Sequence, residues 1–137
     1  MVLDDTIREI LQQPLVARVS TLDPDGFPHT VPIWYMLDGD DIVIATGEGA
    51  RNLRNIRANP KGAVVIGGEP KDERHIEYAP GYLCQGEFVI EDDPDQAWIR
   101  RIAHHYRDDD RIEQDITAWG THTVIRLKIR NVIKVMP

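Results

Sequence analysis

The chain has 137 residues, of which 42% are hydrophobic and 28% are charged, and its formal net charge is -7. This length and apolar content are typical of one folded unit with a hydrophobic core, so we expect a single domain over residues 1–137. The acidic balance argues against binding to nucleic acid, and no apolar run approaches the roughly 20 residues that would cross a membrane bilayer.

The N-terminal segment predicts a helix and then a strand. Apolar side chains recur at helical spacing within residues 4–13, and residues 15–22 are rich in β-branched side chains. The sequence DPDGFP that follows predicts a turn. Because the first residues lack the basic and then apolar order of a signal peptide, we expect a cytoplasmic protein.

Residues 29–37 (HTVPIWYML) predict a second strand that contains Pro32. Proline cannot donate a hydrogen bond to a sheet, so Pro32 belongs at an edge, at a bulge, or where the sheet opens towards a ligand. If the sheet opens, the backbone groups on both sides of Pro32 become available to that ligand; the alternative is that Pro32 only ends pairing at an edge. Trp34 and Tyr35 point to opposite faces, so we expect one in the core and the other at a surface or interface.

Residues 42–46 predict a third strand, and residues 50–58 predict a helix that Asn59 and Pro60 end. Between them lies a corner, Gly47-Glu48-Gly49. Leu53 and Ile56 share one face of this helix. The opposite face, which we expect to be exposed, carries Arg51, Arg54, Asn55 and Ala58.

Arg51 lies in the first turn of the predicted helix, next to the positive end of the helix dipole. That position is unfavourable for a cation unless an anion binds there. A phosphate group would receive backbone N–H groups from the glycine corner and the charge of Arg51, with the Thr46 hydroxyl as a further donor. The alternative is a solvated basic face, paired with acidic residues such as Glu48.

The second half of the chain predicts three strands and two helices. The strands cover residues 61–68, 75–90 (one long strand or two short ones) and 121–135 (bent near Asn131), and the helices run up to about residue 107 and over 112–119.

Cys84 is the only cysteine, so we expect a plain buried thiol and no disulfide. Adjacent His104 and His105 diverge by about 100° on a helix, so we expect no metal site. Core packing is the expected role of Trp119; covering a ligand ring or facing a partner is the alternative.

About six strands separated by turns, with few and peripheral helices, predict a mainly β fold built as a small antiparallel barrel. The nucleotide-binding and hydrolase motifs GxGxxG, GxxxxGK[ST], HExxH and GxSxG are absent.

The sequence VARVSTLDPDGFPHTVPIWYMLDGDDIVIAT, followed by ARNLRNIRANPKGAVVI, resembles the split-barrel flavin-binding proteins related to pyridoxamine 5'-phosphate oxidase. The resemblance covers about the first half of the chain, where a proline-containing strand, a hairpin and a basic helix ending in Asn-Pro follow in a fixed order. It implies a six-stranded antiparallel split β-barrel of the Greek-key type with a few peripheral helices. It also implies a homodimer with a flavin at the subunit interface.

The same resemblance implies the cofactor-binding residues. The flavin ring would lie against the backbone of Thr30, Val31, Pro32, Ile33 and Trp34. The phosphate of the cofactor would be held by Thr46, Gly47, Arg51, Asn52 and Arg54. A lysine often occupies the position of Asn52 in the family, so binding of the phosphate here would depend on Arg51, with Arg54 assisting. The C-terminal RNVIKVMP has no counterpart of the substrate-binding segment of the vitamin oxidases, so we do not expect that activity.

These features lead to one main hypothesis and three alternatives. The main hypothesis is an FMN-dependent oxidoreductase that acts on a small organic substrate, in which the cofactor supplies the hydride chemistry and no side chain is assigned as a catalytic acid or base. A reductase that uses the deazaflavin coenzyme is the first alternative, since RNLRNIRANP is as similar to that branch of the family. The others are a non-catalytic flavin or haem protein that acts as a carrier or sensor, and a barrel that has lost its ligand.

Overall fold

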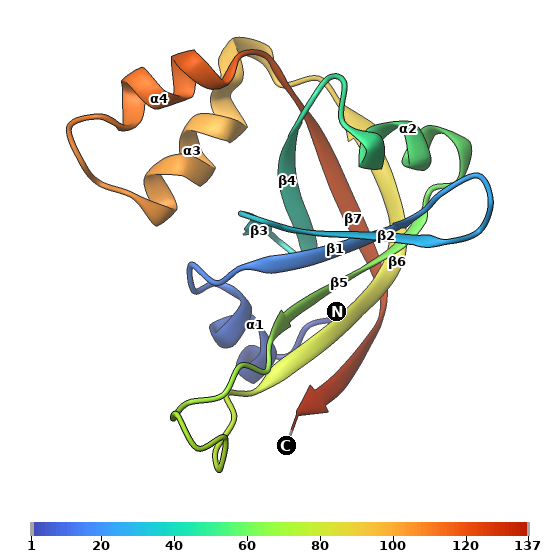
Figure 1. Ribbon diagram of the computed structural model, residues 1–137, viewed down its shortest axis with the longest axis vertical. Coiled ribbons are helices and arrows are strands. Elements are labelled where there is room, and N and C mark those ends of the chain that lie inside the picture. The colour runs from blue at the N-terminus through green and yellow to red at the C-terminus, as the bar shows by residue number, and fades with distance from the viewer. Residues whose placement is uncertain (1, 137) are drawn as a thin grey trace.

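The structure of the chain is a computed structural model that describes residues 2–136, the side chain of residue 136 excepted (Figure 1). Over these residues the chain forms the strands β1 (Ala17–Leu22), β2 (Pro28–Ile33), β3 (Met36–Asp38), β4 (Asp41–Gly47), β5 (Lys61–Gly67), β6 (Gly81–Glu91) and β7 (His122–Met136). The α-helices are α1 (Asp5–Leu11), α2 (Arg51–Ala58), α3 (Ala97–Tyr106) and α4 (Ile112–Trp119), and the short 3-10 helix η1 (Pro94–Gln96) precedes α3.

The strands form one antiparallel sheet in the order β2-β1-β5-β6-β7-β4-β3. Its two edge strands, β2 and β3, follow each other in the chain with only Trp34 and Tyr35 between them. The sheet must therefore curl until its edges approach, which gives a barrel with a split along one side (Figure 1). The expected split-barrel fold is confirmed, with seven strands instead of six, because the crossing at Trp34 and Tyr35 divides the expected second strand into β2 and β3.

The long strands β6 and β7 run from one end of the barrel to the other (Figure 1). Their register shifts between Gln85 and Gly86, where β7 carries one extra residue, Arg130, close to the bend expected near Asn131. A side chain on Gly86 would place its Cβ 2.0 Å from the carbonyl oxygen of Lys128, so this bulge requires glycine. The segment before β6 forms no strand; it is a loop closed by a bridge between Pro70 and Tyr78.

Most of the core fills the barrel interior, where Ile42, Ile44, Leu53, Ile125 and Leu127 are all fully buried. Each such side chain stabilises the fold by roughly 1.5–3 kcal/mol. Leu53 brings α2 into this core, as the sequence predicted. α1 closes one end of the barrel with Leu11 (Figure 1).

A second hydrophobic cluster covers the outer face of β4. It joins Ala45 to Ile99, Ile102, Ala103, Ile112 and Ile116, and thereby fixes α3 and α4 on the outside of the barrel. Both faces of β4 are therefore covered, which explains why its interior positions are all buried.

Cys84 is fully buried in the barrel core, as expected from the sequence. Burial raises the pKa of this thiol to about 11, so the thiol stays protonated and unreactive near neutral pH. Among residues 2–136, none of the helices combines the length and apolar composition that crossing a membrane requires.

Candidate functional site

The edge strand β2 has a free side. It pairs with β1, where Pro32 lies opposite Arg18, and within residues 2–136 no strand pairs with its other side. The side chains of His29, Val31 and Ile33 point inwards and are half-buried, whereas those of Thr30 and Pro32 are exposed. Pro32 thus lies in an edge strand, and the backbone polar groups along the free side of that strand can contact a ligand.

His29 gives a second indication of an incomplete site. Its Nδ1 atom is buried and has no hydrogen-bond partner among the described residues. A buried polar atom without a partner costs free energy, so a bound ligand or water would stabilise this part of β2.

The junction between β2 and β3 is held by an aromatic residue of α3. Tyr106 accepts a hydrogen bond from the backbone N–H of Tyr35 over 3.0 Å, and its hydroxyl proton lies near the carbonyl oxygens of both Leu15 and Tyr35. Tyr35 is in the core and donates to the carbonyl oxygen of Leu11 over 2.7 Å. Trp34 points the other way and stacks on Tyr106, with ring centroids 4.7 Å apart and planes 7° apart. The expectation that Trp34 and Tyr35 face opposite sides is confirmed.

A cavity of about 380 Å³ opens beside this junction. We call it the aromatic groove; it is lined by Val16, Pro32, Ile33, Trp34 and Trp119. Trp119 meets Trp34 almost edge-on, with ring centroids 6.1 Å apart and planes at 74°. The expectation that Trp119 packs in the core is wrong: it is 41% exposed, because α4 lies outside the barrel and its last residue lines the groove.

The N-terminus of α2 lies near the other end of β2 and is not capped by the chain. The N-cap residue, Ala50, has no side chain that can accept a hydrogen bond, and the first turn contains no acidic residue. Arg51 lies in this turn instead. Free N–H groups and a cation together favour an anion at this position.

Arg51 is paired with Asp23, in the turn between β1 and β2. Its Nε donates to Asp23 Oδ1 over 2.9 Å and its Nη2 donates to Oδ2, which leaves Nη1 free within residues 2–136. Hydrogen bonds from Arg51 and then from Asn55 hold the pKa of Asp23 below its usual value. Arg51 is therefore paired with an acidic residue, as the alternative reading of the basic face suggested, and the partner is Asp23, not Glu48.

The expected division of α2 into a buried apolar face and an exposed basic face is wrong at Asn55. Asn55 was predicted on the exposed basic face, but only 4% of it is exposed. Its Nδ2 donates to Asp23 Oδ1 over 2.9 Å and to Thr21 Oγ1 over 3.1 Å. The buried face of α2 is thus wider than an apolar pattern can show, because it includes amide side chains that are satisfied by polar groups of β1 and its turn.

The remaining predicted phosphate contacts divide into a buried pair and exposed positions. Thr46 and Asn52 are each 4% exposed, and the Thr46 hydroxyl donates to Asn52 Oδ1 over 3.0 Å. Gly47 is half-buried at the end of β4. Arg54 is exposed, and no ion pair of its guanidinium occurs within the described part of the chain.

β2 connects these two regions. Asp23 hydrogen-bonds to Phe27, beside the start of the strand, and the aromatic groove begins at Pro32. The strand from Pro28 to Ile33 spans about 17 Å at about 3.3 Å per residue. The structure thus brings Arg51, Asn52, Thr46 and Gly47 to one end of β2 and Trp34 to the other, an arrangement that suits an elongated ligand.

Sequence reasoning missed Asp23, Tyr106 and Val16. Asp23 belongs to a sequence, DPDGFP, that already had a sufficient explanation as a turn. Tyr106 was part of an ordinary apolar helix stripe, and its contact with Tyr35 spans 71 positions of the chain. No local pattern could have shown that contact.

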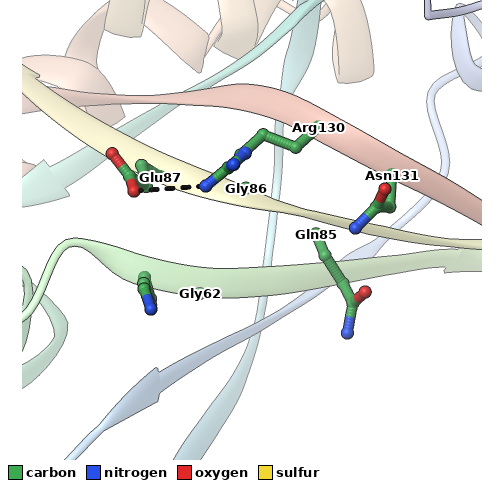
Figure 2. Close-up of a pocket in the computed structure, with 7 residues that line it drawn as sticks. Gly62, Gln85, Gly86, Glu87, Arg130 and Asn131 are labelled. Carbon is green, nitrogen blue, oxygen red and sulfur yellow. Dashed lines mark ion pairs between the residues drawn. The ribbon is translucent and has the colours of Figure 1, made fainter.

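A further surface lies on the outer face of the sheet. A cavity of about 430 Å³ is lined there by Lys61, Gly62, Gln85, Gly86, Glu87, Arg130 and Asn131. Figure 2 shows Gln85 and Asn131 on it, and the ion pair of 3.6 Å between Arg130 and Glu87 at its rim. The row of side chains across this face contains no charge: Thr30, Ser20, Ala63, Gln85 and Asn131 lie opposite one another in register.

Comparison with known proteins supports this description of the fold. The family described as Pyridoxamine 5'-phosphate oxidase matches residues 3–136. No curated protein matches the chain. Among solved structures, one named F420 Reductase is 19% identical, with a TM-score of 0.74 and with 96% of this chain and 98% of that chain covered.

Two other solved structures share the fold. General Stress Protein 26 from Bacillus anthracis is 18% identical, with a TM-score of 0.68 and with 98% of this chain and 95% of that chain covered. A heme binding protein from Mycobacterium smegmatis is 18% identical, with a TM-score of 0.71 and with 93% of this chain but only 51% of that chain covered. Because the family match spans residues 3–136, the chain belongs to the pyridoxamine 5'-phosphate oxidase family.

Proposed function

We propose that this chain is a flavin-dependent oxidoreductase that acts on a small organic substrate and binds FMN at the interface of a homodimer. The observation that supports it is the free edge of β2, which runs from an uncapped, cationic helix N-terminus to Trp34, beside the aromatic groove. An elongated cofactor matches this arrangement, with its phosphate at the helix N-terminus and its flat ring along the β2 edge.

The phosphate end would depend mainly on Arg51. Asp23 fixes the guanidinium through Nε and Nη2, so that Nη1 can reach a phosphate oxygen without breaking the pair. Arg54, exposed near the start of the same helix, adds positive charge. The backbone at Gly47 and the first-turn N–H groups supply neutral donors.

Thr46 and Asn52 would act together at this end. The Thr46 hydroxyl occupies Asn52 Oδ1 and thereby leaves the amide N–H groups of Asn52 for another acceptor. Asn52 would then be a neutral phosphate donor at the position where relatives often carry lysine. Thr46 is a positioning residue in this arrangement.

The ring end would lie along Thr30–Trp34. The backbone polar groups on the free side of β2, which no neighbouring strand in residues 2–136 pairs with, can bond the polar edge of a flavin ring. The bound flavin supplies the hydride transfer, and the chain binds it, orients it and excludes water from it. No side chain of the described residues is assigned a proton transfer.

A second copy of the chain would complete the site. The uncharged row on the outer face of β1, β2, β5, β6 and β7 ends at Thr30, on the same edge strand that would hold the ring. The next row contains Arg18, which pairs with Glu69, and then the apolar side chains Val65, Leu83 and Ile133, of which Ile133 is 48% exposed. The uncharged strip is bordered by Arg18 and by the charged residues of the cavity, Lys61, Glu87 and Arg130, and an uncharged strip with a charged rim is suited to a two-fold contact.

The decisive experiment is a titration of the purified protein with FMN, followed by absorbance and by ultracentrifugation. We expect a shifted flavin spectrum at one FMN per subunit, and turnover of an organic electron acceptor when a reductant is supplied. Saturation without turnover would instead indicate a non-catalytic binder. The absence of any spectral change would rule out FMN.

The deazaflavin-dependent reductase is the second candidate, supported by the similarity of RNLRNIRANP to that branch and by the fold shared with F420 Reductase. The same titration with the deazaflavin coenzyme separates the two, because the tighter ligand is the cofactor. A haem titration tests the third candidate, a non-catalytic haem protein, which is motivated by the fold shared with the heme binding protein.

A further inference from the structure

We propose that the aromatic groove is a binding site for a flat, uncharged aromatic molecule, and that Trp119 selects for such a molecule. The assignment of this molecule as the substrate rests on the proposed function, but its binding to the groove does not.

The lining of the groove defines the chemistry of its ligand. None of the five side chains that line it carries a charge, and its volume of about 380 Å³ lies in the range of small-molecule sites. A charged ligand would lose its hydration without gaining a partner there. An uncharged ring would replace water on exposed apolar surface, since Trp119 is 41% and Val16 is 36% exposed.

The orientation of the two tryptophan rings favours a flat ligand over a merely apolar one. Trp34 is held in place by its stack on Tyr106, which does not line the groove. Trp119 stands at 74° to Trp34, so the groove has two aromatic walls that are nearly perpendicular. A flat ring that stacks on one wall meets the other wall edge-on, and aromatic pairs prefer both of these geometries.

Trp119 can be changed without disturbing the barrel. α4 is fixed to α3 through Ile112 and Ile116, in the cluster outside β4, and Trp119 is the last residue of α4. Gly120 follows it with φ +81°, which ends the helix. Trp119 belongs to neither hydrophobic cluster of the described residues and touches them only through Trp34, so its main contribution is to the groove.

The groove adjoins the proposed flavin position without coinciding with it. Pro32, Ile33 and Trp34 belong to both, whereas Val16 and Trp119 belong to the groove alone. The proposed flavin ring lies along β2, and its end away from α2 is at Trp34. A molecule held against Trp119 would therefore lie next to that end of the flavin ring.

The test is an NMR titration of the full-length chain with 2-naphthol, observed at the indole N–H signals of its three tryptophans. Trp98 in α3 lies beside Arg101 and Arg126, does not line the groove, and serves as an internal control. We expect the signals of Trp34 and Trp119 to move while that of Trp98 stays. Decahydro-2-naphthol, which is not flat, and naphthalene-2-sulfonate, which is charged, should bind roughly 3- to 10-fold more weakly.

Two variants complete the test. Trp119→Leu keeps apolar volume and should weaken 2-naphthol binding roughly 3- to 10-fold, whereas Trp119→Phe should keep most of it. Equal movement of all three indole signals, equal binding of the saturated analogue, or no effect of Trp119→Leu would overturn the proposal. So would the loss of 2-naphthol binding at protein concentrations at which the chain dimerises, because a second copy would then cover the groove.

Repeating the titration with saturating FMN separates the two proposals. We expect 2-naphthol still to bind; its displacement by FMN would mean that the groove holds the flavin ring itself and would overturn a separate substrate site. If FMN does not bind at all, the proposed function fails. The titration with 2-naphthol alone still tests whether the groove binds aromatic molecules.

Discussion

The hydroxyl of Tyr106 bridges the backbone of Tyr35, accepting from its N–H over 3.0 Å and lying 3.1 Å from its carbonyl oxygen. This contact occurs where the chain leaves one edge of the sheet and starts the other, so the Tyr35 backbone groups have no strand partner there. One helix residue thus satisfies the groups that the split exposes, and the same ring supports Trp34 at the candidate site.

Tyr106→Phe tests the importance of this contact. The ring stack with Trp34 is kept, but the N–H of Tyr35 and the carbonyl oxygen of Leu15 lose their partner. We expect the free energy of unfolding to fall by about 1–3 kcal/mol, measured by urea denaturation. The matched control is Tyr78→Phe in the exposed loop before β6, for which we expect a change below about 0.5 kcal/mol.

The same tyrosines predict a loss of stability at alkaline pH. Burial raises the pKa of Tyr106 to about 12 and raises that of Tyr35 further, while a tyrosine in the unfolded chain titrates near pH 10. Between about pH 10 and 12 the unfolded chain therefore releases protons that the folded chain retains, so the contribution of the tyrosines to stability is complete below about pH 10 and falls above it. The buried Cys84 thiol, whose pKa is raised to about 11, adds a loss that begins at a lower pH and is the same in both proteins. Urea midpoints measured along this range should fall less steeply for Tyr106→Phe. Parallel curves for the two proteins would contradict the burial effect.

Arg51→Ala should weaken FMN binding about 10- to 100-fold, the scale of a lost charge-assisted contact. Arg57→Ala is the control, since it removes the same charge from the last turn of the same helix. Dissociation constants at several salt concentrations provide the measurement, and the difference between the two variants should shrink as salt screens the charge. An equal effect of both variants would place the phosphate elsewhere.

Thr46→Val separates positioning from direct binding. Valine has nearly the shape of threonine but cannot donate to Asn52 Oδ1, so we expect a loss of about 1–2 kcal/mol in the free energy of unfolding. FMN affinity should fall a few-fold, because the amide of Asn52 is then free to rotate. Thr117→Val, on the exposed side of α4, should change neither quantity. Full FMN affinity in Thr46→Val would remove Asn52 from the phosphate site.

The comparison of sequence and structure shows which kinds of contact a pattern can reveal. The strands, the turns and the helix over residues 51–58 follow from local spacing, and so does the position of Pro32 at an edge. The burial of Asn55 could not be predicted in this way, because it depends on the polar partners Thr21 and Asp23, which are 34 and 32 positions away in the chain.

The prediction that Trp119 packs in the core was wrong for a different reason. A large aromatic residue on a helix is usually buried, and only the place of α4 outside the barrel leaves it exposed. The strand count was one too low because an unbroken apolar run does not show that the chain crosses from one sheet edge to the other at Trp34 and Tyr35. Such features depend on tertiary contacts, which a single sequence does not contain.

Ile133→Glu tests whether the outer face of the sheet joins two copies of the chain. Ile133 lies opposite Leu83 on this face and is 48% exposed, so a buried carboxylate at its position would oppose association while leaving the monomer folded. Ile76→Glu, at the 67% exposed Ile76 in the loop before β6, makes the same change away from the sheet face. Sedimentation should show a dimer for the unchanged chain and for Ile76→Glu, and a monomer for Ile133→Glu. If the site is completed by the second copy, FMN affinity falls together with dimerisation; a dimer that persists in Ile133→Glu would place the interface on another surface.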